Sequence, residues 1–148
     1  MLQFLIIVLA FIMMEITAWA THKYVMHGFL WSLHEDHHTP TENTFQKNDS
    51  FALIFAIPSA SGIILGSHFS NDILFYSGIG ILLYGLAYLF VHDIFIHRRI
   101  KFFSSSKTRY FKAVLHAHRL HHVNREKENC KYFGMLYVPR SVFKSMKN

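Results

Sequence analysis

The sequence predicts an all-α fold: a polytopic membrane helical bundle of about three to four transmembrane segments, with a histidine-rich metal site at its cytoplasmic end. Three observations lead to this prediction: the composition of the 148-residue chain, the length of its uncharged segments and the grouping of its 12 histidines. The chain is 51% hydrophobic and only 16% charged, with a mean hydropathy of +0.20. A small soluble domain needs more charge on its surface, and the length suits a single domain over residues 1–148.

Three apolar segments are long enough to cross a bilayer. Residues 1–14 are uncharged and the apolar character continues past Glu15, enough to span about 30 Å of hydrocarbon. Uncharged runs over 51–67 and 73–91, separated by a short polar turn, predict a helical hairpin in the membrane. Pro58 leaves three alternatives open for the second segment: a full crossing, a strong tilt or kink, or a re-entrant path.

Basic residues are concentrated in the C-terminal third of the chain. Thirteen of the 15 Lys and Arg lie between Arg98 and Lys147, and only two acidic residues accompany them. The positive-inside rule places this third in the cytoplasm, and with three crossings residues 22–50 lie on the same side. We therefore expect an integral inner (cytoplasmic) membrane protein with a cytoplasmic C-terminus and metal site. Anionic lipid explains the basic charge, so we expect no nucleic-acid partner.

The single cysteine, Cys130, limits the redox chemistry that this chain can perform alone. One cysteine excludes an internal disulfide framework, a thiolate zinc finger and a self-contained iron–sulfur cluster. The chain also has no G-x-G-x-x-G motif and no flavin signature. Electrons for any redox reaction must therefore come from another protein, and a basic cytoplasmic face suits an acidic donor.

Ten of the 12 histidines form a pattern that occurs twice. An H-x4-H pair is followed by an H-x2-H-H triplet, first within residues 22–38 and again within residues 92–122. Neutral imidazole is a good ligand for iron, zinc, copper or nickel, so this pattern predicts a metal site. The predicted ligands are His22, His27, His34, His37, His38, His92, His97, His118, His121 and His122. His68 falls outside the pattern, and His116 is excluded because it lies about 160° around the helix from His118.

Helical geometry indicates how these histidines meet. Residues at i, i+3 and i+4 share one face within about 100°, so each triplet can converge as half of a metal site. The pairs at i and i+5 lie about 140° apart on an ideal helix, which suits either two neighbouring metals or a local unwinding. Helices over 2–27 and 73–97 would be about 39 Å and about 38 Å long. Both overshoot the bilayer and carry their histidine pairs to the cytoplasmic interface, where all ten histidines can meet.

Three carboxylates are candidates for orienting the ligands from outside the metal's coordination sphere. Asp36 and Asp93 each adjoin predicted ligands, and carboxylates in such positions commonly orient metal-bound imidazole. Plain solvation at the surface is the alternative for Asp36. Glu15 lies inside the first apolar segment, where a carboxylate is costly and tends to be functional. It is expected either to accept a hydrogen bond from a ligand N–H or to be the packing partner of a neighbouring helix.

The predicted chemistry is oxygen activation at a dinuclear site, directed at a C–H bond of a lipid. Zinc is redox-inert and cannot by itself activate dioxygen, so iron is the predicted metal. Zinc can nevertheless replace labile iron during purification.

Four stretches, three of which include predicted ligands, are distinctive in their full sequence: HKYVMHG at 22–28, VHD and HRR within 91–99, AHRLHH at 117–122, and FGMLYVP at 133–139, shortly after Cys130. With the histidine groups, they resemble the membrane fatty acid hydroxylase superfamily and, within it, the bacterial β-carotene 3-hydroxylases. The chain departs from the usual pattern at Glu35-Asp36.

The resemblance implies an all-α membrane fold and a non-haem di-iron monooxygenase in which the same ten histidines hold two irons. It also implies dioxygen as co-substrate and electrons from a ferredoxin and its NAD(P)H-dependent reductase. The implied reaction hydroxylates the 3 and 3′ ring carbons of β-carotene, giving β-cryptoxanthin and zeaxanthin.

A long carotenoid would lie among the helices with one ring end near the metals. Aromatic residues are the candidate lining, with ordinary packing as the alternative for each: Trp19, Phe29, Trp31, Tyr88, Phe90 and Phe95. One competing function is a fatty acid or sterol hydroxylase or desaturase of the same superfamily. Another is a metal carrier or transporter, which is disfavoured because the histidines gather at one end of the helices rather than along a path across the membrane.

Overall fold

The computed structural model describes residues 1–39, 45–99 and 108–146, and these residues contain helices but no strand. The α-helices are α1 (Leu2–Ala20), α2 (Trp31–His38), α3 (Phe51–His68), α4 (Asp72–Tyr88), α5 (Arg109–His122) and α6 (Arg140–Ser145). Three further helical turns join or extend them: η1 (Thr21–Phe29), η2 (Lys47–Ser50) and η3 (Leu89–Ile96). The predicted all-α fold is confirmed.

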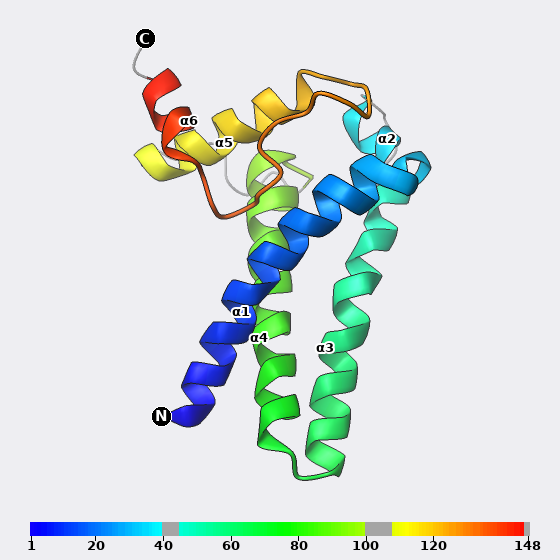
Figure 1. The fold of residues 1–148 in the computed structure, drawn as a ribbon, viewed down its shortest axis with the longest axis vertical. Coiled ribbons are helices and arrows are strands. Elements are labelled where there is room, and N and C mark those ends of the chain that lie inside the picture. The colour runs from blue at the N-terminus through cyan, green and yellow to red at the C-terminus, as the bar shows by residue number, and fades with distance from the viewer. Residues whose placement is uncertain (40–44, 100–107, 147–148) are drawn as a thin grey trace.

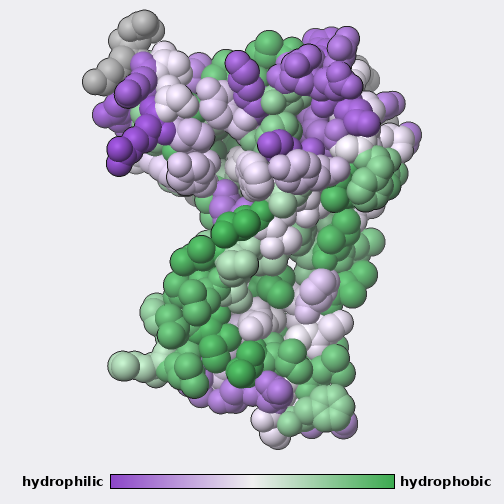
Figure 2. Space-filling model, viewed as in Figure 1, coloured by the Kyte–Doolittle hydropathy of each residue, from purple (hydrophilic) through white to green (hydrophobic). Residues whose placement is uncertain are grey.

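The long helices α1, α3 and α4 form an elongated bundle, here called the shank, and the shorter helices gather at one end of it (Figure 1). Three helical segments are long and apolar enough to cross a membrane: Leu2–Phe29, which is kinked at Gly28, Lys47–His68 and Asp72–Ile96. Figure 2 shows the resulting division, with an apolar shank below and a polar end above. The predicted membrane bundle is therefore confirmed, and α3 runs through Pro58 without a break, as a full crossing requires.

Close backbone approach holds the shank together. A Cβ on Gly66 would overlap the backbone nitrogen of Phe75, so α3 and α4 touch through their main chains there. A Cβ on Gly80 would lie 2.6 Å from the carbonyl oxygen of Ile7, where α1 crosses α4. In a bilayer, packing of this kind drives helix association, because lipid tails are as apolar as the side chains.

The predicted polar turn connects α3 to α4. Ser70 adopts a left-handed conformation with φ of 50°, which reverses the chain. Asn71 then caps α4, because its side-chain oxygen accepts a hydrogen bond from the Leu74 backbone nitrogen at 3.1 Å. Asp72 in the first turn complements the positive end of the helix dipole.

Residues 123–139, here called the strap, connect α5 to α6 and return from the polar end toward the shank (Figure 1). Met135 of the strap is buried with Val91 and Val114, which ties the strap to both η3 and α5. Beyond the strap, Val142 of α6 is fully buried against α5. The polar end is therefore a packed unit built onto the membrane helices.

Candidate metal centre

The ten histidines of the repeated pattern meet at the polar end in two adjoining clusters. The first cluster has ligand atoms that all lie within 4.8 Å of one another and consists of His22, His27, His34, His38 and His121. The same limit joins His37, His97, His118 and His122. His92 completes this second cluster, since its Nε2 lies 3.1 Å from that of His37. The clusters meet where the His38 and His122 rings stack at 4.4 Å.

Each triplet is divided between the two clusters, which differs from the expectation that its imidazoles converge on one half-site. In residues 34–38 the outer two histidines enter the first cluster and His37 enters the second. In residues 118–122 the outer two enter the second cluster and His121 the first. The reason is angular: i and i+4 lie about 40° apart on a helix, whereas i+3 lies about 60° to the other side of i. The middle histidine of each triplet therefore belongs to the cluster formed mainly by the other half of the pattern: His37 to the second cluster and His121 to the first.

Local changes of helix type bring the i, i+5 pairs together. Both pairs lie in or at the end of π-helical turns: His22 and His27 in η1, and His92 and His97 at η3. The His97 backbone nitrogen donates to the His92 carbonyl oxygen at 2.9 Å, an i to i+5 bond. In a π-turn, residues five apart lie nearly above one another, and such turns are frequent at functional sites. Of the two alternatives for these pairs, the structure has the local change of helix, with each pair in one cluster.

All five Nδ1 atoms of the first cluster face an acceptor. Four lie 2.9–3.1 Å from backbone carbonyl oxygens of the strap, which belong to Asn124, Lys127, Lys131 and Phe133. The fifth, on His34, lies 2.6 Å from the Asn48 side-chain oxygen. A carbonyl can only accept, so each Nδ1 facing one carries the hydrogen and leaves its Nε2 as a lone pair.

These lone pairs point at one another, which fits a cation at the centre of the cluster. The Nε2 atoms of His27 and His121 are 3.2 Å apart, and those of His34 and His38 are also 3.2 Å apart. Burial lowers the pKa of His121 to about 3 and that of His38 to about 4, so these two imidazoles are neutral at neutral pH. Neutral nitrogens with Nδ1 already bonded cannot hydrogen-bond to each other through Nε2. A metal ion at the centre of the cluster would give all five Nε2 lone pairs a partner.

In the second cluster, side chains orient two of the five histidines within the described part of the chain. His37 Nδ1 lies 3.1 Å from the Gln46 side-chain oxygen, and His92 Nδ1 lies 3.2 Å from an Asp93 carboxylate oxygen. Arg99 pairs with Asp93 at 3.4 Å and with Asp49 at 2.8 Å. The Nε2 of His122 is buried without a hydrogen-bond partner among the described residues, as expected of a nitrogen reserved for a metal.

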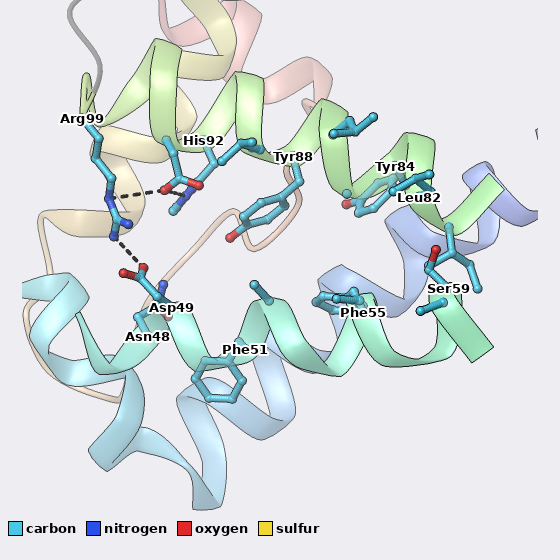
Figure 3. A pocket seen from close by; sticks show the side chains of 18 of the residues that line it. Asn48, Asp49, Phe51, Phe55, Ser59, Leu82, Tyr84, Tyr88, His92 and Arg99 are labelled. Carbon is cyan, nitrogen blue, oxygen red and sulfur yellow. Dashed lines mark hydrogen bonds and ion pairs between the residues drawn. The ribbon is translucent and has the colours of Figure 1, made fainter. Parts of the chain in front are cut away.

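An apolar cavity of about 680 Å³ runs between α3 and α4 and reaches the second cluster. His92, Tyr88 and Asp93 line the part that reaches the second cluster, and Figure 3 shows the Tyr88 ring projecting from α4 toward α3. Farther along, aliphatic and small side chains line it, among them Ala56, Ala60, Ile63, Ile81 and Gly85. This volume is typical of a site for a small organic ligand.

The model of one protein family, described as fatty acid hydroxylase, matches residues 7–140. The chain belongs to this family. It is 42% identical to the β-carotene hydroxylase of Pantoea ananas over 91% of this chain and 77% of that protein. The identity is also 42% with that of Pseudescherichia vulneris (90% and 76% covered) and 35% with that of Paracoccus sp. strain PC1 (94% and 86%). No solved structure matches.

In this member of the family the three candidate carboxylates have different surroundings. Asp93 contacts the ring nitrogen of His92, as described above. Asp36 instead accepts a hydrogen bond from the Lys47 backbone nitrogen at 2.6 Å. Glu15 accepts from the Tyr84 hydroxyl at 2.9 Å, so it bonds to a neighbouring helix, and its other oxygen bonds to the strap.

The two remaining histidines lie away from both clusters. His116 is within hydrogen-bonding distance of Ser145 on α6, at 3.2 Å. His68 ends α3 at the opposite end of the shank.

Several residues that shape the site were not found from the sequence. Asn48 and Gln46 orient one histidine each, and Arg99 bridges two acidic residues beside the cavity. The strap acts through backbone carbonyls, which leave no side-chain signal. Of the six aromatic residues expected to line a substrate site, Tyr88 alone lines this cavity. Trp31 instead packs on first-cluster rings, 5.1 Å from His27.

Proposed function

We propose that this family member is a membrane di-iron oxygenase that hydroxylates the 3 and 3′ ring carbons of β-carotene, forming β-cryptoxanthin and then zeaxanthin. One observation carries the proposal: two five-histidine clusters adjoin an apolar cavity between membrane helices, in a chain 35–42% identical to bacterial β-carotene hydroxylases. Dioxygen is the oxidant and the electrons come from outside the chain.

The histidine clusters would hold one iron each. Iron supplies the redox chemistry that zinc lacks, activating dioxygen toward an unactivated C–H bond. Imidazoles already oriented by their Nδ1 hydrogen bonds need no rearrangement to bind, which is the usual purpose of partners outside the coordination sphere.

The cavity positions the substrate. One ring of β-carotene enters between α3 and α4 until it meets Tyr88 and His92, while the rest of the polyene extends toward lipid. The Tyr88 ring stacks on His92 at 4.8 Å and forms a flat wall beside the metal end. Holding the ring against this wall selects the carbon that reacts, because proximity and orientation supply much of an enzyme's rate. Hydroxylation of both rings then requires release and insertion of the other end.

In this proposal the protein lies in the inner membrane and its polar end faces the cytoplasm. Lys112 and Arg119 are exposed on α5, the helix that carries the second triplet. An acidic ferredoxin, reduced by its NAD(P)H-dependent reductase, would be attracted to such a surface.

Pigment chromatography tests the proposal. In bacteria that make β-carotene, with iron and a competent electron donor supplied, the wild type should yield zeaxanthin and β-cryptoxanthin. His121→Ala should leave β-carotene unchanged, whereas the matched control His116→Ala should behave as wild type because His116 lies outside both clusters. Untouched β-carotene in the presence of folded, iron-loaded wild type would refute the carotenoid assignment. Hydroxylated fatty acids in that case would favour the activity for which the family is named.

A further inference from the structure

A carboxylate within the first membrane segment holds the strap. Glu15 Oε1 lies 3.0, 3.0 and 2.9 Å from the backbone nitrogens of Met135, Leu136 and Tyr137. Its Oε2 accepts from the Tyr84 hydroxyl of α4 at 2.9 Å. Three consecutive N–H groups converging on one oxygen form the kind of concave nest that backbone makes around anions. Glu15 therefore fixes the strap to α1 and α4 at one point.

The strap in turn fixes the first cluster. Just before the nest, the Lys131 and Phe133 carbonyls accept from Nδ1 of His121 and His22 at 2.9 and 3.0 Å. The Phe133 ring also packs on both of these histidines and on His27, with centroids 5.2–5.5 Å apart. Only Gly134 separates Phe133 from the nest, so a shift of the nest moves these acceptors.

We propose that Glu15 is a positioning residue for the first cluster: it anchors the strap so that the Lys131 and Phe133 carbonyls hold His121 and His22 with Nε2 free for a metal. The inference rests on the metal site proposed above but not on the identity of the substrate. It also explains a costly carboxylate at this depth, because an intramembrane ionisable group needs a specific set of partners.

The effect should be selective. The side-chain acceptors of the second cluster, Gln46 and Asp93, lie outside the strap. Glu15 itself contacts no imidazole among the hydrogen bonds of the described residues. A loss confined to the first cluster therefore separates positioning from a general loss of fold.

Metal titration of the purified, chelator-treated full-length protein tests this inference, with Co²⁺ followed by its visible absorption as the probe. The wild type should bind two ions per chain. Glu15→Leu removes every acceptor for the nest, so the Lys131 and Phe133 carbonyls lose their placement. Because such direct partners of metal ligands are usually worth at least about tenfold in metal affinity, the affinity for one of the two ions should fall at least about tenfold while the other ion binds as before. Glu15→Gln keeps an acceptor and should fall between the two.

Two further variants make the result independent of the folding of Glu15→Leu. Tyr84→Phe removes the bond to α4 but keeps the strap, and should bind both ions as wild type. Gly134→Ala keeps Glu15 but places a Cβ 3.3 Å from its Oε1 and 3.1 Å from the Tyr137 carbonyl oxygen, so it should weaken the same ion as Glu15→Leu.

Three results would overturn the proposal. Glu15→Leu with both sites intact, or with both weakened alike, would remove the selective role. Tyr84→Phe weakening one ion as strongly as Glu15→Leu would place the effect in α4. Wild type binding fewer than two ions would refute the metal site and this inference together, whereas a failed pigment test with two ions bound would refute only the carotenoid assignment.

Discussion

The two histidine clusters have the same number of imidazoles but different supports. In the first, four backbone carbonyls of the strap and the Asn48 side chain contact all five Nδ1 atoms, whereas in the second, among the described residues, the side chains of Gln46 and Asp93 contact the Nδ1 atoms of two of the five histidines. Backbone supports cannot be changed by a substitution at the supporting residue, so the first cluster depends on the path of the strap. The two supports that the structure shows for the second cluster are individual side chains, and this cluster adjoins the cavity through His92. We infer that the orientation of the first cluster is set by the fold of the strap, whereas substitutions of single side chains can change the orientation of the second cluster, which lies beside the cavity.

Blocking the cavity tests whether the second cluster is the one that faces substrate, and it should have the largest effect. A Cβ on Gly85 meets no atom within 4 Å, so Gly85→Leu fills the cavity without straining the backbone. We expect β-carotene turnover in the pigment assay to fall by about 100-fold, the scale of a misplaced substrate, with both ions retained. Leu83→Phe, on an exposed part of α4 outside the cavity lining, is the control. Undiminished turnover by Gly85→Leu would remove the cavity from the account.

Neutralising Asp93 tests the side-chain support of the second cluster. Asp93→Asn should lower the affinity for one ion by about tenfold, because the carboxylate that orients His92 loses its charge. The ion affected should be the one that Glu15→Leu leaves alone, as judged by Co²⁺ titration. Asp36→Asn is the matched control, since Asp36 bonds to backbone rather than to an imidazole. Equal losses in the two variants would contradict the assigned support, as would unchanged metal affinity and turnover in Asp93→Asn.

The smallest effect is expected from Gln46→Ala. Gln46 is only half-buried and shares its side-chain oxygen with Arg99, so water can replace its bond to His37. Its loss should lower the metal affinity of the second cluster by less than about tenfold, which is below the range usual for such partners. Asn48→Ala should cost the first cluster more, because Asn48 is buried and bonds to His34 at 2.6 Å. A larger loss of Co²⁺ affinity in Gln46→Ala than in Asn48→Ala would show that burial does not determine the strength of these two supports.

The sequence predicts the membrane segments and the ten histidines because both depend on residue type and spacing alone. Uncharged runs determine the helices, and the doubled histidine pattern marks the residues that gather at one end. The assignment of histidines to clusters is different. The division of each triplet follows from the angles of an ideal α-helix, but which cluster each i, i+5 pair joins depends on the π-turns η1 and η3, which ideal α-helical geometry does not contain.

The aromatic residues proposed as a substrate lining show a second limit of the sequence. Phe29 is 78% exposed, and Phe95 is buried against Phe111 instead of the cavity. An aromatic side chain near a membrane interface suits lipid, core and ligand equally well, so residue type does not separate these uses. The lining that does occur includes small residues such as Ala56, which leave space rather than fill it.

The most direct test of the two-cluster account compares two histidines of the same triplet, His121 and His118. Each is changed to Ala in full-length protein, and the Co²⁺ spectrum of each variant is recorded beside that of the wild type. We expect two ions in the wild type and one in each variant, with His121→Ala losing the ion sensitive to Glu15 and His118→Ala losing the other. Loss of the same ion in both variants would contradict the division of the triplet and, with it, the two crossed clusters.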